Sequence, residues 1–141
     1  VTLVRPDILS VMKKGEHSST FGGNPLACAA GTATLHALTQ DGLIENAKSI
    51  GEKFSNGLEE LKSKHPIIRE VRGKGLMIGV ELKFEVKDIL MEGIKNGLLL
   101  LYSGRNILRF LPPLVISEED TVKTLQILDK LLTNEENRRN A

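Results

Sequence analysis

The sequence lacks the features that mark several large classes of protein. It contains one cysteine, Cys28, so it can form neither an internal disulfide nor a cysteine-based metal site, and we expect a reducing, cytoplasmic setting. Its 19 basic and 18 acidic side chains leave a formal net charge of +1, which predicts no nucleic-acid partner. The longest apolar runs, residues 97–101 and 107–116, fall well short of the roughly 20 residues that a membrane span needs.

The composition is otherwise that of a globular protein. Hydrophobic residues make up 40% of the chain and charged residues 26%, which is enough apolar material to bury a core. No signal peptide is predicted, because Arg5 and Pro6 interrupt the opening apolar residues at once. The first residue is not methionine, so we expect the sequence to be processed or to be a segment of a longer protein.

Two short elements are predicted at the start of the chain. Residues 1–5 are β-prone and end at Pro6, which fits the end of a strand. Asp7 is placed to cap one short helix over residues 8–14.

The next segment is a polar loop that leads into a second helix. The loop covers residues 16–23 and contains two glycines. Asn24 fits the N-cap position and Pro25 the first position of a helix that continues over residues 26–38. Most side chains of this helix are small and allow close approach from nearly every side, so we expect the helix to be buried.

The rest of the chain predicts helices packed on a small sheet. Residues 43–64 repeat apolar side chains every three or four positions, which indicates an amphipathic helix. A second helix is predicted over residues 85–96, and Ser117 with Asp120 predicts the capped start of a third, whose polar end over residues 134–141 is expected to fray. Four segments have strand character, residues 67–73, 76–83, 98–102 and 107–110.

This order of elements predicts an α+β fold. Its small, largely antiparallel sheet is expected to be covered by helices on one face.

The loop before the second helix is the first candidate binding site. Residues 18–25 combine three hydroxyl groups, two glycines and a helix start, and such hydroxyls and free amides can bind a phosphate with help from the helix N-terminus. The alternative is a simple Gly-Gly turn that leads into a capped helix, which composition alone favours. The spacing matches neither a P-loop nor a dinucleotide-binding motif.

Four segments, in this order, carry a resemblance to one family. Residues 17–30 (HSSTFGGNPLACAA), 71–82 (VRGKGLMIGVEL), 97–99 (GLL) and 108–114 (LRFLPPL) closely resemble segments of the class III aminotransferases. These are pyridoxal-phosphate enzymes of the ornithine and acetylornithine type. The nearest branch is that of the acetylornithine aminotransferases, including relatives that act on carrier-protein-linked lysine precursors.

The resemblance implies a fold-type I pyridoxal-phosphate transferase. Residues 1–42 would be the end of the large cofactor-binding domain with a connecting helix, and residues 43–141 the C-terminal small domain. In relatives, the Schiff-base lysine, the acid paired with the pyridine nitrogen and the aromatic stacked on the ring all lie upstream of the position of Val1. We therefore expect no catalytic residue and no metal site in these 141 residues, and no activity from them alone.

The resemblance also assigns roles to three residues. Thr20 would donate to the cofactor phosphate across the interface of a homodimer, and Ser19 would contact the amino-acid substrate. Ser18 stands where the family more often has glycine, which restricts the torsions of the loop. Arg109 would bind a substrate carboxylate, for which its planar guanidinium is suited. The alternative for Arg109 is a strand-end arginine paired with a local acid.

The implied reaction moves the terminal amino group of N-acetylornithine, or of an N-acylated or carrier-linked lysine, to 2-oxoglutarate. An ornithine or 4-aminobutyrate aminotransferase and a catalytically inactive binding or assembly module are the alternatives. Of the remaining candidates, Cys28 is expected to be a small packed residue, and His17, Arg72 and Lys74 are expected to be structural or solvated.

Overall fold

The computed structural model describes residues 3–13, 15–16 and 18–140. The chain divides into two compact units, Val1–Ala37 and Leu38–Ala141, and each is described by itself. The predicted domain boundary after residue 42 stays a prediction. Among the described residues, no helix has both the length and the apolar character that crossing a membrane requires.

The start of the first unit differs from the prediction. The described residues before Pro6 form no strand, and helix α1 covers only Pro6–Leu9. The helix starts at Pro6 because proline needs no amide donor at the first helical position and its φ is already helical. Asp7 is therefore inside the first turn rather than at the cap, and its carboxylate pairs with Arg5 at 3.1 Å.

Helix α2 covers Pro25–Gln40, and its predicted cap is confirmed. The Ala27 amide donates to Asn24 Oδ1 at 2.9 Å, while Asn24 Nδ2 donates to the carbonyl of Phe21 at 2.7 Å. The expected burial of this helix is wrong for this chain, because none of its residues is buried. Small side chains permit close packing, but the described part of the first unit contains no second long element to supply it.

The second unit contains a four-stranded sheet that is antiparallel throughout. Its strands are β1 (Ile68–Lys74), β2 (Met77–Leu82), β3 (Leu101–Ser103) and β4 (Ile107–Phe110), in the spatial order β1-β2-β4-β3. The turn between β1 and β2 lies at Gly75 and Leu76, one residue later than predicted, and Gly75 takes the positive φ of +56° there. The α+β prediction with a largely antiparallel sheet is confirmed.

Strand β3 is shorter than predicted, because residues 98–100 do not join the sheet. They follow helix α4 (Lys87–Lys95), and the Leu98 amide donates to the carbonyl of Gly93 at 2.8 Å. This bond closes the last turn of the helix, so the chain reaches the sheet only at Leu101.

Two long helices complete the unit. Helix α3 covers Leu43–Lys64, the predicted range, and helix α5 covers Glu118–Asn140. The predicted cap of α5 is confirmed, since the Asp120 amide donates to Ser117 Oγ at 3.1 Å. The expected fraying of its end is wrong for residues up to 140. Buried Glu135 pairs there with Arg138 and Arg139, and the Arg139 guanidinium lies 3.5 Å from the centre of the Phe84 ring.

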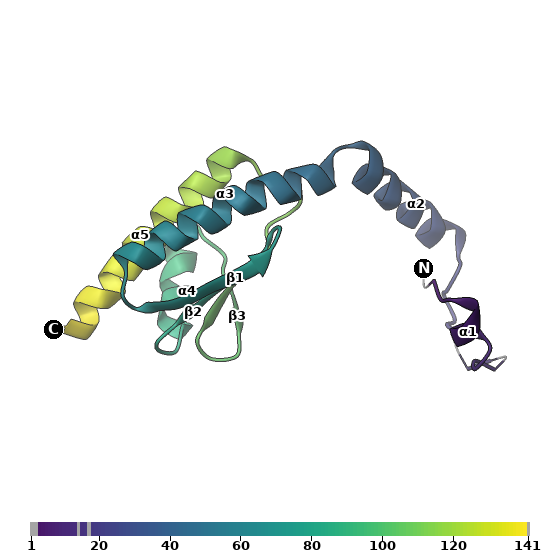
Figure 1. Cartoon of the computed structure of the whole chain (residues 1–141), viewed down its shortest axis with the longest axis horizontal. Helices are drawn as coiled ribbons and strands as arrows, with labels where there is room; N and C mark the ends of the chain where they lie inside the picture. The colour runs from purple at the N-terminus through teal and green to yellow at the C-terminus, as the bar shows by residue number, and fades with distance from the viewer. Residues whose placement is uncertain (1–2, 14, 17, 141) are drawn as a thin grey trace. The chain divides into compact units, whose positions relative to one another are not determined.

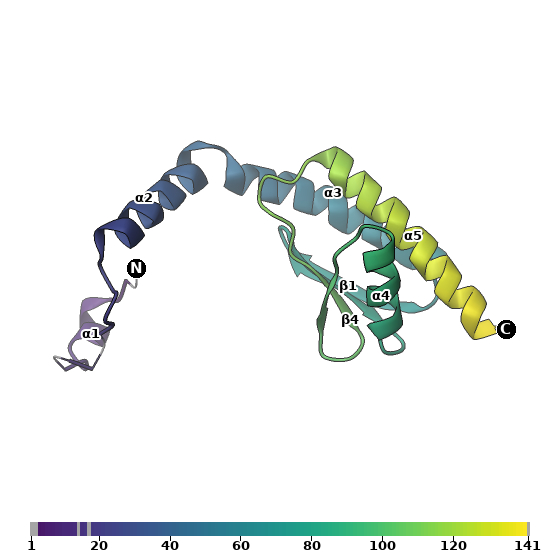
Figure 2. The ribbon, with the colours of Figure 1, turned by 180° about the vertical axis from the view of Figure 1, so that it is seen from behind.

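The helices cover one face of the sheet and leave the other open. Figures 1 and 2 show α3 and α5 side by side across the sheet. Alternate side chains of β2 and β4 point into the core beneath these helices, where Phe54 meets Phe110 edge to face at 5.2 Å between ring centres. The buried core includes Phe54, Leu58, Ile78, Val80, Leu82, Leu108, Phe110, Leu128 and Leu132. The opposite face carries polar side chains, among them Arg72, Glu81 and Arg109.

Candidate functional site

The phosphate-loop candidate forms a tight, exposed turn in the first unit. The Gly22 amide donates to the carbonyl of Ser19 at 3.3 Å, and the Asn24 amide to the carbonyl of Phe21 at 3.4 Å. Gly23 takes a φ of +75°, which returns the chain to the start of α2. The loop therefore holds its shape through its own backbone.

Both predicted hydroxyls of this loop, those of Ser19 and Thr20, are exposed. Within the described residues, neither Ser19 nor Thr20 makes a side-chain hydrogen bond. The helix N-terminus offers less than the sequence suggested, because Pro25 has no amide proton and the Ala27 amide is taken by Asn24. The exposed hydroxyls of Ser19 and Thr20 are therefore the main candidate donors to a phosphate.

The third predicted residue, Arg109, lies in the second unit on the open face of the sheet. It stands in β4 between Gly79 of β2 and Leu101 of β3, and its side chain is exposed. In the part of the chain that the structure describes, no acid pairs with Arg109. The alternative prediction of a local acidic partner is therefore not observed.

A shallow hollow of about 310 Å³ lies beside Arg109. Its floor includes Gly79, which has no side chain, and the two strands flanking Gly79 place Arg72 and Arg109 in one row across the sheet. The lining residues are Arg72, Gly73, Met77, Ile78, Gly79, Ser103, Ile107 and Arg109. A guanidinium without an ion-pair partner among the described residues, at the edge of an open hollow, can bind a carboxylate.

The acid closest in register to Arg109 is held by two other arginines. Arg69 Nη1 donates to Glu81 Oε1 and Arg72 Nη1 to Glu81 Oε2, each at 2.9 Å. Arg72 Nη1 also donates to Glu70 at 2.6 Å. The bond from Arg72, followed by that from Arg69, holds the pKa of Glu81 below its usual value, so this carboxylate is charged.

Sequence reasoning missed this network and treated Arg72 as a solvated charge. A usable signal was present, because a two-residue turn at Gly75 and Leu76 places Arg72 opposite Gly79 and Glu70 opposite Glu81.

A second polar cluster joins α3 to α5. His65 is only 2% exposed, and its ring nitrogens lie 2.7 Å from Asp129 Oδ1 and 2.9 Å from Glu136 Oε2. Bonds from Lys64 and then His65 lower the pKa of Asp129. The contacts join residues more than 60 positions apart, so no local pattern predicts them.

Cys28 and His17 are two further residues that the sequence singled out. Cys28 was expected to be packed and is exposed, because α2 is uncovered. His17 lies outside the described residues. Among the residues that are described, no three His, Cys, Asp or Glu side chains are grouped to hold a metal ion.

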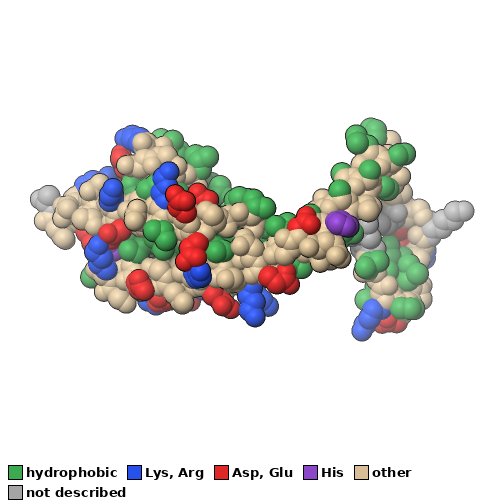
Figure 3. Space-filling view, turned by 90° about the horizontal axis from the view of Figure 1, so that it is seen from above, with side chains coloured by type: hydrophobic (Ala, Val, Ile, Leu, Met, Phe, Trp, Pro, Cys, Tyr) green, Lys and Arg blue, Asp and Glu red, His purple; other side chains and the backbone are tan. Residues whose placement is uncertain are grey.

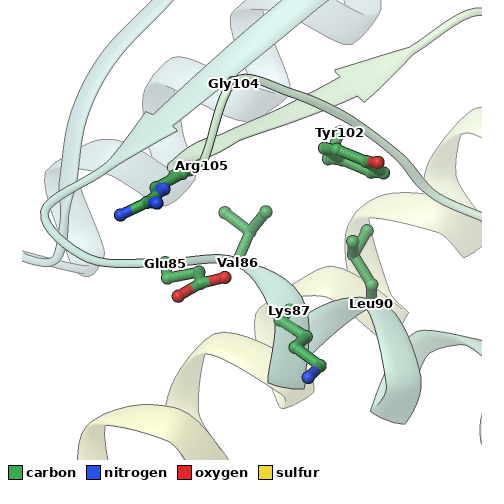
Figure 4. Close-up of a pocket in the computed structure, with 7 residues that line it drawn as sticks. All are labelled: Glu85, Val86, Lys87, Leu90, Tyr102, Gly104 and Arg105. Atoms are coloured by element: carbon green, nitrogen blue, oxygen red, sulfur yellow. The ribbon is translucent and has the colours of Figure 1, made fainter.

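A hollow of about 320 Å³ near the edge strand β3 is mainly apolar at its centre. Figure 4 shows Val86, Leu90 and Tyr102 pointing toward one another, whereas Lys87 and Arg105 point away. Its charged groups do not converge, so it is a weaker candidate than the open face at Arg109.

Comparisons of the sequence and the structure with known proteins all point to one family. The family described as aminotransferase class-III matches residues 1–132. The acetylornithine aminotransferase of Caldanaerobacter subterraneus subsp. tengcongensis is 46% identical over 132 residues, which are 93% of this chain and 34% of that protein. Ornithine aminotransferase 1 of Staphylococcus saprophyticus is 38% identical over 130 residues, which are 92% of this chain and 32% of that protein.

Solved structures agree with the sequence matches. The ornithine δ-aminotransferase of Plasmodium falciparum superposes with a TM-score of 0.86 at 37% identity, covering 93% of this chain and 34% of that one. The acetylornithine aminotransferase of Elizabethkingia anophelis gives a TM-score of 0.85 at 36% identity, with 94% and 34% covered. The chain thus spans about a third of the length of these relatives. With a family match over 132 of its 141 residues, the chain belongs to the class III aminotransferases.

Proposed function

We propose that the protein containing this chain is a pyridoxal-phosphate-dependent aminotransferase. Its amino donor is N-acetylornithine, or an N-acylated or carrier-linked lysine, and its acceptor is 2-oxoglutarate. The observation that carries the proposal is the family match over residues 1–132. Relatives named acetylornithine aminotransferase, at 46% and 42% identity, support the choice of donor.

The loop at Thr20 fits the phosphate of the cofactor. A phosphate oxygen needs hydrogen-bond donors, and the Thr20 hydroxyl is exposed with no partner among the described residues. When bound, pyridoxal phosphate would take up the electron pair that remains when the carbon bearing the transferred amino group loses its proton. In a homodimer, Thr20 of one subunit holds the phosphate of the cofactor in the other subunit's site. Ser19 contacts the amino-acid substrate.

Arg109 orients the substrate by binding one of its carboxylates. Its guanidinium can form two parallel hydrogen bonds to one carboxylate, which fixes both position and direction. The hollow over Gly79 leaves space for that carboxylate. Arg109 is thus assigned to binding and orientation.

An ornithine aminotransferase is the second candidate, and specific observations favour it. Relatives with that name reach 44% identity, and the P. falciparum structure superposes with a TM-score of 0.86. The two donors differ in whether an acyl group masks the α-amine, so a comparison of the free and acetylated amino acids separates them.

The test measures glutamate formation by the whole protein with pyridoxal phosphate and 2-oxoglutarate. N-acetylornithine, N-acetyllysine, ornithine and 4-aminobutyrate are supplied in turn as donors. We expect the highest kcat/KM with one of the two acetylated donors. A clear preference for ornithine or 4-aminobutyrate would support those alternatives, and no turnover of any donor by cofactor-loaded protein would support an inactive module.

A further inference from the structure

We propose that Arg69 and Arg72 are positioning residues that hold Glu81 away from Arg109 and so keep Arg109 free for a carboxylate. The inference rests on the proposed function, in which Arg109 binds a substrate carboxylate.

The register of the sheet places Glu81 within reach of Arg109. Gly79 is opposite Arg109 and Glu81 is opposite Ile107, so Glu81 and Arg109 are diagonal neighbours on the same face. Diagonal neighbours on adjacent strands are about 7–8 Å apart, a gap that long side chains can bridge. A Glu81–Arg109 ion pair is therefore sterically accessible, yet it is not formed.

Both carboxylate oxygens of Glu81 are instead occupied by other donors. From β1, Arg69 donates to Oε1 and Arg72 to Oε2, each at 2.9 Å, and Asn106 Nδ2, just before β4, also donates to Oε1 at 3.3 Å. The Glu81 side chain is only 16% exposed. A shift in strand register between Ile68 and Glu70 accompanies the approach of Arg69 to this face.

Arg72 also bridges two carboxylates that would otherwise repel each other. Glu70 and Glu81 are direct partners across β1 and β2, and like charges in that position are unfavourable. Arg72 Nη1 donates to both, at 2.6 Å and 2.9 Å. Without Arg69 and Arg72, the Glu81 carboxylate would turn toward Arg109, which carries no ion pair among the described residues.

That turn would place an internal competitor in the carboxylate site. A substrate carboxylate would then have to displace Glu81 from Arg109 before binding. Substrate binding would weaken, while the reacting atoms and the cofactor would be unaffected. The expected signature is a rise in KM with little change in kcat.

The experiment compares variants of the whole protein with pyridoxal phosphate. The double variant Arg69→Gln/Arg72→Gln should raise KM for the substrate that uses Arg109 about fivefold, as expected for competition from a partly exposed ion pair, with kcat within about twofold. Adding Glu81→Gln should restore KM, because the competing charge is gone. Arg138→Gln, which removes an arginine paired with Asp88 and Glu135 elsewhere on the unit, is the matched control and should leave KM unchanged.

The outcomes separate this inference from the proposed function. If Arg109→Lys leaves KM for both substrates unchanged, Arg109 does not bind a carboxylate and both claims fail. If Arg109→Lys raises KM but the double variant does not, or if Glu81→Gln fails to restore KM, only the positioning role is overturned. Should the double variant not fold, Arg72→Gln alone should give a smaller rise that Glu81→Gln reverses, and no rise in it would refute the inference.

Discussion

Replacing Gly51 by alanine tests the seating of helix α3 on the sheet. A Cβ atom at Gly51 would lie 2.3 Å from the carbonyl oxygen of Gly75 and 2.4 Å from its carbonyl carbon. These are backbone atoms of the β1–β2 turn, where Gly75 has a positive φ. The turn cannot move away as a side chain would, so either the helix or the hairpin must shift.

The magnitude follows from two opposing terms. Alanine stabilises a helix interior by about 1 kcal/mol relative to glycine. Overpacking costs about 1–3 kcal/mol, and a clash with backbone belongs at the upper end. We expect Gly51→Ala to lower the free energy of unfolding by about 2 kcal/mol.

Gly57→Ala in the same helix is the matched control. Its Cβ would meet Leu125 Cδ1 at 2.3 Å, but that atom is the end of a flexible side chain. A rotamer change costs about 1 kcal/mol, which offsets the gain in helix propensity. Urea unfolding followed by circular dichroism should place Gly57→Ala within about 1 kcal/mol of the unsubstituted protein. A Gly51→Ala variant as stable as the parent would refute the close contact.

Three further predictions concern the cofactor, the α3–α5 cluster and the isolated chain. Thr20→Ala should weaken cofactor retention by about one to two decades, from the loss of a hydrogen bond to a charged group, and an unchanged absorbance titration would contradict its role. The lowered pKa of Asp129 contributes stability that is fully present above the unfolded value of about 4 and is lost as the pH falls through the folded value. The urea midpoints of the protein and of Asp129→Asn should therefore converge on acidification, and a widening gap would contradict this. A polypeptide of these 141 residues alone should neither turn over N-acetylornithine nor keep pyridoxal phosphate through dialysis, because none of its lysines stands in the context of the family's cofactor lysine; stable cofactor bound to one of them would show that the catalytic centre is misplaced.

The sequence correctly predicted the helices and caps whose determining residues lie within the element itself. Helix α3 has the predicted bounds because an apolar stripe runs along all of it, and the Ser117–Asp120 cap is visible in four consecutive residues. The end of α5 was mispredicted because a polar tail alone indicates fraying. Glu135 pairs with Arg139 one turn along the same helix, and Arg139 also contacts Phe84 from a distant part of the chain. The exposure of α2 depends on what covers it, which its own residues do not specify.

The residues of the candidate site were likewise predicted only in part. Ser19, Thr20 and Arg109 were identified by resemblance, and the structure adds that their side chains have no hydrogen-bond or ion-pair partner among the described residues. The pairing of Glu81 with Arg69 and Arg72 depends on strand register and on the irregularity after Ile68. Composition and spacing read separately for each strand do not reveal it.

The carboxylate-binding role of Arg109 is the central claim, and a single kinetic comparison tests it most directly. The whole protein and its Arg109→Lys variant are compared for KM toward the amino donor and toward 2-oxoglutarate, with unfolding measured in parallel. An ammonium group keeps the charge but cannot make the two-bonded contact, so we expect KM for at least one of the two substrates to rise well beyond twofold. KM values within about twofold for both substrates, together with reduced stability, would show that Arg109 has a structural role only.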